Sequence, residues 1–432
     1  MSTIASSPHV ATLVAGFDTH PAYAGLAESL RGLIADGRLA HGIRLPSERD
    51  LAPALGVSRT TVTRAYGELI DRGYAVARRG AGTFARIPGG PTRTLDRALT
   101  PRLDGGELID LNCAAGSAAT GLAAAYEEAL GELPGYLSGH GYYPSGLPEL
   151  QAALAATFDA RGYPTAPEQI LITPGALSAT AIAARALVRR GERVLVESPV
   201  YPNAVAALRE SGGRLVTIGV DEHGWDVAGM RATLGTSKPR AAYLIADFQN
   251  PTGHVMSASL RETLGSALAR AGTIAVVDEA HQQLNLDGPP MPLPLGAAVE
   301  AAGGSAITVG SASKSFWGGL RIGWLRAPEA LIPALTQARL ALDLGVPVLE
   351  QLVMVRLLAE PEPHLAAHRA ALRVQRDALI AAVSEAFPEW RFRRPTGGLA
   401  LWCELPAPVA HEFSLAAERH GVAISPGPLF AP

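Results

Sequence analysis

Lysine occurs only at positions 238 and 314 of this 432-residue sequence. Lys314 lies in Gly310-Ser-Ala-Ser-Lys-Ser-Phe-Trp-Gly-Gly-Leu-Arg321, directly after the short apolar run 306–309. A lysine can lose its proton when it is desolvated and can then form an imine with an aldehyde, whereas arginine stays protonated. Lys238 lies in the polar turn Thr-Ser-Lys-Pro-Arg and reads as a surface charge. The sequence therefore predicts imine chemistry at Lys314.

Other residues with useful chemistry also follow short apolar runs. Residues 173–178, Thr-Pro-Gly-Ala-Leu-Ser, open a helix whose backbone N–H groups could hold a phosphate. Asp278 closes a Val-Val run, where a carboxylate could pair with a protonated pyridine nitrogen. Asn250-Pro-Thr-Gly253 and Tyr201 follow two further runs. Taken singly, each fits an ordinary turn, cap or loop residue better, so only their combination carries weight.

The elements that must position these residues alternate along the chain from Leu108 onward. Strands are predicted at 169–172, 193–196, 242–245, 273–277 and 306–309, and a helix at 176–189 follows the first. Such alternation is typical of an α/β fold with a largely parallel sheet, in which ligands bind at the carboxyl ends of the strands. The candidate residues follow those strands, so we expect them at one edge of the sheet.

The N-terminal segment has a different pattern. Apolar residues at helical spacing predict a helix over 23–36, and Gly37 ends it. Ser47 and Asp50 form a capping box that opens a second helix running to about Leu55. Ser58 caps a third helix, which continues to about Arg72. Residues 74–84 have β character on both sides of the basic tip Arg-Arg-Gly-Ala-Gly, which predicts a hairpin.

The third helix begins with small hydroxyl side chains and arginines. Residues 58–61 are Ser-Arg-Thr-Thr, and Arg64 follows one turn later. These side chains reach phosphates and guanine edges in DNA, so the helix reads as a recognition helix. Residues 21–86 contain ten arginines against six acids, about +4, whereas the whole chain has a net charge of -3. This asymmetry also points to nucleic acid as the partner of the N-terminal segment.

A capped three-helix unit alone is often plain packing, but here the resemblance is longer. The run from Pro21 to Phe84 resembles the GntR type of winged helix-turn-helix, through Leu-Pro-Ser-Glu-Arg-Asp-Leu-Ala and Gly-Val-Ser-Arg-Thr-Thr-Val-Thr-Arg-Ala-Tyr. The resemblance implies that double-stranded operator DNA is the partner. Together with the recognition-helix pattern, it predicts DNA contacts from Arg49, Ser58, Arg59, Thr60, Thr61, Arg64, Arg79 and Gly80.

From about residue 108 to the end, the order of the motifs resembles fold-type I pyridoxal-phosphate enzymes, the aspartate aminotransferase superfamily. The resemblance implies that Lys314 forms the internal aldimine as the catalytic residue. It implies that Asp278 pairs with the pyridine nitrogen, Asn250 donates to the ring hydroxyl and Tyr201 stacks on the ring. The residues expected around the phosphate are Gly175, Ala176, Leu177, Ser311, Ser313 and Arg321. Tyr142 or Tyr143 is expected to reach the phosphate of a neighbouring subunit.

The fusion of these two parts resembles the MocR family of bacterial transcriptional regulators. It implies a homodimeric regulator that senses pyridoxal phosphate or its adduct with an amine or amino acid. A regulator that senses only the free cofactor vitamer is a variant of this reading. The alternative is an active aminotransferase with an accessory DNA-binding domain. Effector, operator and direction of regulation stay open.

The sequence departs from the superfamily pattern at two places. His281 stands three residues after Asp278, where the superfamily usually has tyrosine. It could donate to the ring hydroxyl and change its charge near neutral pH, or its neighbours could hold it in one state. Relatives also continue past Phe430 to a strand with the arginine that grips a substrate carboxylate, whereas this sequence ends at Pro432. Either the sequence is truncated, or the domain holds the cofactor without this clamp. No role is predicted for the arginines at 391, 393 and 394.

Composition bounds the remaining possibilities. Cys113 and Cys403 are the only cysteines and lack metal-ligand spacing, so neither a metal site nor a disulfide framework is expected. No signal peptide or membrane span is recognisable, which predicts a cytoplasmic protein. The expected organisation is an N-terminal lead (1–20), the winged helix-turn-helix (21–86), a Pro/Gly-rich linker (87–107) and the aminotransferase-like domain (108–432) without its last strand.

Overall fold

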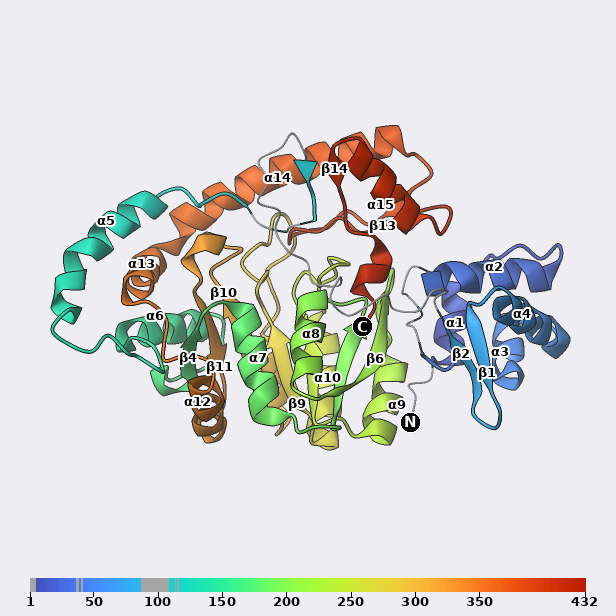
Figure 1. The fold of residues 1–432 in the computed structure, drawn as a ribbon, viewed down its shortest axis with the longest axis horizontal. Helices are drawn as coiled ribbons and strands as arrows, with labels where there is room; N and C mark the ends of the chain where they lie inside the picture. The colour runs from blue at the N-terminus through green and yellow to red at the C-terminus, as the bar shows by residue number, and fades with distance from the viewer. Residues whose placement is uncertain (1–4, 36–38, 40–41, 87–108, 113, 115) are drawn as a thin grey trace.

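The computed structural model describes residues 5–35, 39, 42–86, 109–112, 114 and 116–432. The predicted linker, residues 87–107, lies wholly outside these residues. Figure 1 shows a small N-terminal unit beside a larger α/β part.

The N-terminal unit is built as the sequence predicts, with one addition. Its elements are α1 (Ser7–Leu13), α2 (Ala22–Ala35), α3 (Glu48–Leu55), α4 (Arg59–Asp71), β1 (Ala75–Arg78) and β2 (Gly82–Ala85). The Ser47 and Ser58 hydroxyls accept from the Asp50 and Thr61 amides, which confirms both predicted caps. Helix α1 lies in the segment predicted only as a lead, and Val10 and Val14 pack into the same core as Leu30.

Eight of the described strands form one sheet. Their order is β4 (Ile170–Thr173), β11 (Gly323–Arg326), β10 (Ala306–Ser311), β9 (Ile274–Asp278), β8 (Ala241–Leu244), β5 (Arg193–Ser198), β6 (Arg214–Asp221) and β7 (Gly224–Trp225). Neighbours from β10 to β6 are parallel, while β11 and β7 pair antiparallel to their neighbours. The predicted largely parallel sheet is therefore confirmed.

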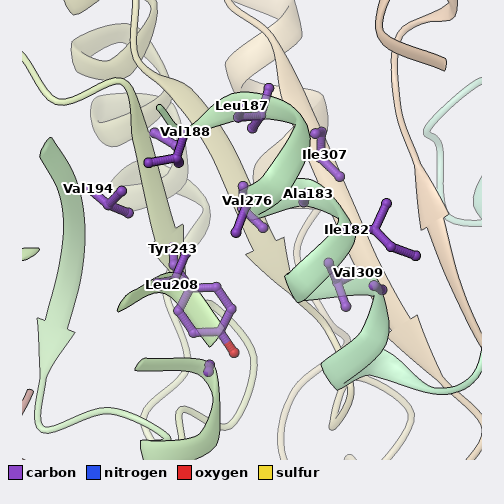
Figure 2. Close-up of a cluster of buried hydrophobic side chains, with 14 of the residues drawn as sticks. Ile182, Ala183, Leu187, Val188, Val194, Leu208, Tyr243, Val276, Ile307 and Val309 are labelled. Carbon is purple, nitrogen blue, oxygen red and sulfur yellow. The ribbon is translucent and has the colours of Figure 1, made fainter. Parts of the chain in front are cut away.

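Helices cover both faces of this sheet. One face packs against α7 (Ala176–Leu187), α8 (Pro202–Glu210) and α12 (Ile332–Leu340), and Figure 2 shows part of that core. The other face packs against α9 (Val227–Ser237), α10 (Ala258–Ala271) and α11 (Leu295–Ala301). Helices cover both sides of β8 and β9, so both strands are apolar along their length, except for Asp278 at the end of β9.

The remaining elements form a helical layer and a small C-terminal part. The layer contains α5 (Leu122–Glu132), α6 (Pro148–Asp159) and α13 (Val348–Ala359), which share a core with β4 and β11. The C-terminal part contains α14 (Pro361–Ala386), β12 (Arg391–Phe392), β13 (Cys403–Glu404), α15 (Ala410–Arg419) and β14 (Val422–Ala423), which pairs with β3 (Ile109–Asp110). Short 3-10 helices lie at Leu133–Tyr136, Pro167–Gln169, Gly318–Leu320, Glu329–Leu331 and Gly427–Phe430.

Candidate functional site

A cavity of about 1060 Å³ lies beside the carboxyl ends of β5, β8, β9 and β10 and continues into the C-terminal part. Most of the residues predicted to bind the cofactor line it, although they come from widely separated segments. These residues are Ala176, Leu177, Tyr201, Asn250, Asp278, His281, Ser311, Ser313, Lys314 and Arg321. The fold therefore brings together the positions that the sequence singled out.

Lys314 follows β10 and lies in the cavity wall. Its Nζ donates a hydrogen bond to the backbone oxygen of Ala114. A ring nitrogen of His368, on α14, lies 3.1 Å from the Lys314 backbone oxygen. Contacts from two distant segments thus hold the lysine and its backbone at the cavity, where an aldehyde could reach the amine.

Asp278 ends β9 and is almost fully buried. Its carboxylate accepts hydrogen bonds from the Tyr243 hydroxyl at 2.6 Å and from the Ala280 amide at 2.8 Å. Burial raises the pKa of Asp278, and the two hydrogen bonds and the charge of Lys314 lower it in part. A buried carboxylate gains from a cationic partner, so this position fits a protonated ring nitrogen.

The strand-to-helix turn before α7 and Arg321 form the other end of the candidate cofactor site. Gly175 has φ +91°, and a Cβ there would lie 2.7 Å from Nη2 of Arg321. The same Nη2 donates to the Pro174 backbone oxygen at 2.8 Å. Glycine is therefore needed for the guanidinium to reach the first turn of α7. Helix N–H groups, the guanidinium and the hydroxyls of Ser311 and Ser313 make a donor set that suits a phosphate.

The surroundings of His281 bear on its two interpretations. Its ring Nδ1 lies 3.2 Å from the Phe248 backbone oxygen, and the side chain is buried. Burial and then the charge of Lys314 lower the pKa of His281 to about 4. The lowered pKa favours the interpretation in which its neighbours hold the ring in one state, neutral, over a charge change near neutral pH.

We expect His281→Gln to flatten the acid side of the stability profile. Because the pKa of His281 falls from 6.5 to about 4 on folding, its contribution is present above pH 6.5 and is lost as pH falls toward 4. That loss amounts to about 3 kcal/mol in the wild type. Urea unfolding between these pH values measures it. His411→Gln, which replaces an exposed histidine, controls for loss of an imidazole. Equal slopes for wild type and His281→Gln would contradict the prediction.

Two buried groups near the site were missed from the sequence. Tyr243, in β8, holds Asp278, and Glu197, in β5, accepts from Trp225 Nε1 at 2.6 Å and from Gln249 Nε2 at 3.0 Å. Burial raises the pKa of Glu197 to about 7. Gln249 precedes Asn250 and accepts from the Thr252 amide and hydroxyl, so this network fixes the Asn250 turn. For Glu197, the signal available in the sequence was a carboxylate within an apolar strand run.

The predicted DNA-contacting residues gather on α3, α4 and the β1–β2 wing. Arg49, Ser58, Arg59, Thr60, Arg64, Arg79 and Gly80 are exposed, and Thr61 is half-buried. Arg59 lies 3.4 Å from the Glu48 carboxylate, and the Arg64 guanidinium lies 3.7 Å from the centre of the Tyr23 ring. The first turn of α4 therefore presents hydroxyls and an arginine to the outside.

The structure also shows one of the two cysteines and the surroundings of possible metal ligands. Cys403 is a free thiol in the cavity wall, and burial raises its pKa to about 11. Cys113 lies outside the described residues. Among the residues that the structure describes, no group of three His, Cys, Asp or Glu side chains could hold a metal ion. Within those residues, too, no helix is both long and apolar enough to cross a membrane.

Family comparisons match both parts of the chain. Residues 136–431 match aminotransferase class I and II, and residues 22–85 match the gntR family of bacterial regulatory proteins. The crystal structure of LysN, an α-aminoadipate aminotransferase from Thermus thermophilus complexed with N-(5'-phosphopyridoxyl)-L-leucine, matches with a TM-score of 0.68 and 30% identity. The match covers 79% of this chain and 87% of LysN. The family and this neighbour imply a pyridoxal-phosphate cofactor.

Two relatives that are named as regulators match most of this chain. The HTH-type transcriptional regulator TauR of Rhodobacter capsulatus is 28% identical, over 92% of this chain and 87% of TauR. The probable rhizopine catabolism regulatory protein MocR of Rhizobium meliloti is 29% identical, over 72% of this chain and 66% of MocR. The chain therefore belongs to the class I and II aminotransferase family and carries a GntR-type helix-turn-helix domain, in the arrangement of the MocR-type regulators.

Proposed function

We propose that this protein is a transcriptional regulator that binds operator DNA through α4 and the β1–β2 wing and responds to pyridoxal phosphate or its adduct with an amine or amino acid. One observation carries the proposal. The same chain presents an exposed helix-turn-helix surface and encloses a cavity with Lys314, Asp278 and Arg321 in its wall. In this proposal the cavity binds the ligand, and the helix-turn-helix surface binds the DNA.

The cavity residues fit the cofactor in three places. Lys314 would attach the aldehyde, Asp278 would face the ring nitrogen, and Arg321 with the first turn of α7 would hold the phosphate. When bound, pyridoxal phosphate supplies an aldehyde carbon that exchanges between primary amines and an electron-withdrawing ring. Tyr201 would cover one ring face, and Asn250 and His281 would approach the ring hydroxyl. Gly175, Ala176, Leu177, Ser311 and Ser313 would complete the phosphate site.

A contact between the two parts supports communication between them. Nδ1 of His9, on α1, lies 3.3 Å from the carboxylate of Asp221 at the end of β6. Asp221 also belongs to the cavity wall, and its carboxylate accepts a second hydrogen bond, from the backbone amide of His223, at 2.7 Å. A ligand changes DNA affinity only if it binds the two arrangements of these parts with different affinity. Asp221 therefore lies in the cavity wall and also contacts α1 of the N-terminal unit.

The proposal includes a cytoplasmic homodimer with the domain limits expected from the sequence. Two copies would present two recognition helices to paired half-sites on DNA. Neither Tyr142 nor Tyr143 belongs to the described wall of the cavity within one chain, which suits a role in a neighbouring subunit. Sedimentation of the purified protein would give the oligomeric state directly.

DNA binding is tested with duplexes selected from a random-sequence library. We expect Arg59→Ala to weaken binding to the selected duplex by about 1–3 kcal/mol, because an exposed arginine at the start of α4 is lost. Fluorescence anisotropy at fixed salt measures the affinity, with and without pyridoxal phosphate and amines. Arg185→Ala, which removes an exposed arginine from α7, is the matched control. Failure to select any sequence would reject the proposal.

The alternative function, an active aminotransferase, gives the opposite pattern in the same experiment. Transamination needs a lysine that moves protons and a group that orients the substrate. Steady turnover of amino acids with keto acids, combined with DNA affinity that ignores both cofactor and amines, would favour the enzyme. Ligand-dependent DNA affinity without steady turnover supports the regulator.

A further inference from the structure

The carboxylate of Glu197, on β5, is fully buried and has different partners on its two oxygens. Its Oε1 accepts hydrogen bonds from Nε1 of Trp225 at 2.6 Å and from the backbone amide of Ile245 at 3.1 Å. Its Oε2 accepts from Nε2 of Gln249 at 3.0 Å. One side chain therefore joins β5, β7 and the chain that follows β8.

Gln249 carries this contact into the Asn250 turn, residues 249–254. Its side-chain oxygen accepts from the amide of Thr252 at 3.0 Å and from the hydroxyl of Thr252 at 2.7 Å. The amide of Gly253 donates to the backbone oxygen of Gln249 at 2.6 Å and closes the turn. Asn250 and Thr252 line the cavity, whereas Glu197 does not. Glu197 thus reaches the cavity wall only through another side chain.

Trp225 brings the β6–β7 hairpin to the same carboxylate. Trp225 lies in β7, which pairs antiparallel with β6, and its ring packs edge-to-face against that of His254, with the centres 6.0 Å apart. At the end of β6, the Asp221 carboxylate lies 3.3 Å from Nδ1 of His9 on α1. The hairpin therefore contacts the N-terminal unit and also holds the carboxylate that fixes the Asn250 turn.

The pattern of donors at Glu197 calls for a carboxylate. Its three hydrogen-bond partners in the described part of the chain are all N–H groups. An ionised carboxylate accepts on both oxygens, whereas a glutamine amide has one acceptor oxygen and one donor group. A glutamine here could satisfy Trp225 or Gln249, but not both. A buried donor that faces another donor is unfavourable, so one of the two contacts would open.

We propose that Glu197 and Trp225 are positioning residues that connect the β6–β7 hairpin to Asn250 in the cofactor site. A shift of the hairpin at its contact with α1 would then reach Asn250 through one buried carboxylate. The inference rests on the proposed function only for the role of Asn250 beside the cofactor ring. The position of the turn itself can be measured without the cofactor.

The turn is tested first on the full chain without pyridoxal phosphate, by hydrogen exchange at the amides of Gln249, Thr252 and Gly253. We expect Trp225→Phe, which keeps an aromatic ring, to speed this exchange about threefold, and Glu197→Gln about tenfold. The carboxylate loses an orienting donor in the first variant and an acceptor oxygen in the second. The double variant should exchange no faster than Glu197→Gln, because Trp225 acts through that carboxylate.

Two substitutions elsewhere are matched controls. Trp324→Phe removes a buried indole on β11 whose Nε1 has no hydrogen-bond partner among the described residues. Glu210→Gln removes an exposed carboxylate at the end of α8. Both variants should exchange at the Asn250 turn as the wild type does. Amides within α10 should keep their wild-type rates in all the variants, which separates local loosening from global unfolding.

The connection to the cofactor site is tested by the affinity for pyridoxal phosphate, measured from the absorbance of the lysine-bound form. The measurement is made at one pH, above the pKa of about 7 to which burial raises Glu197. We expect Trp225→Phe to weaken binding about threefold. In the Asn250→Ala background it should have no further effect, because its influence passes through that side chain. A merely structural role would weaken binding by the same factor in both backgrounds.

Faster exchange at the turn in Trp225→Phe, with an affinity effect that disappears in the Asn250→Ala background, supports the inference. Wild-type exchange in Trp225→Phe, rates that multiply in the double variant with Glu197→Gln, or equal affinity losses in both backgrounds overturn it. If the wild type shows no absorbance of lysine-bound cofactor while Trp225→Phe loosens the turn, the proposed function fails and the connection from the hairpin to the turn stands.

Discussion

The Lys314→Ala protein is expected to lose the absorbance of lysine-bound pyridoxal phosphate completely. Alanine has no amine to attach the aldehyde, and Lys238, the only other lysine, is exposed at the C-terminal end of α9. Under the proposed function, the residues that would hold the phosphate and the ring are unchanged, so the variant should still bind the cofactor weakly and without a covalent bond. Spectra recorded after dialysis against pyridoxal phosphate measure the difference.

The matched control for this prediction is Lys238→Arg, which removes the second lysine and keeps its charge. It should retain the wild-type spectrum. Borohydride reduction before dialysis adds an independent readout, since it should fix the cofactor to the wild type and to Lys238→Arg only. A wild-type spectrum from Lys314→Ala would show that another amine reacts and would overturn the assignment.

The second large effect, a lower free energy of unfolding, is expected when Arg261 on α10 is replaced by alanine. Its guanidinium pairs with the Asp247 carboxylate, and both side chains are almost fully buried, at 2% and 1% exposure. Arg261 also donates to the backbone oxygens of Met256 and Leu293, both at 3.1 Å. Replacing it with alanine leaves a buried, uncompensated carboxylate, which costs about 3–5 kcal/mol in the free energy of unfolding. Urea unfolding measures this cost.

Arg270→Ala is the control for Arg261→Ala, because Arg270 lies exposed on the same helix. Its substitution should change the free energy of unfolding by no more than about 0.5 kcal/mol. Asp247 precedes the Asn250 turn, so Arg261→Ala should also loosen that side of the cavity. Similar unfolding midpoints for both variants would mean that water or another group reaches Asp247.

Local patterns predicted most of the fold, because its strands and helices carry strong periodic signals. The predicted strand 306–309 is observed as Ala306–Ser311, and the helix 176–189 as Ala176–Leu187. Helix α1 was missed, although Val10 and Val14 have helical spacing, since only seven residues carry the pattern. The two-residue strands of the C-terminal part are too short to leave a periodic signal.

The candidate site was predictable where a residue follows a strand, and less so where its role depends on a partner far along the chain. Asp278 could be named from its position at a strand end. Its partner Tyr243 looks like any core aromatic until β8 and β9 are placed side by side. Arg393 and Arg394 are adjacent in sequence, and only their three-dimensional surroundings show which one faces the cavity.

The position of Asp221 between α1 and the cavity has a consequence for the DNA itself. Under the proposed function, a ligand that alters operator affinity by some factor must have its own affinity altered by operator DNA by the same factor. The promoter then acts as an effector of the cavity. Molecules seated on their operator and molecules elsewhere in the cell would respond at different ligand concentrations, so the number of binding sites would help to set the sensitivity of the response.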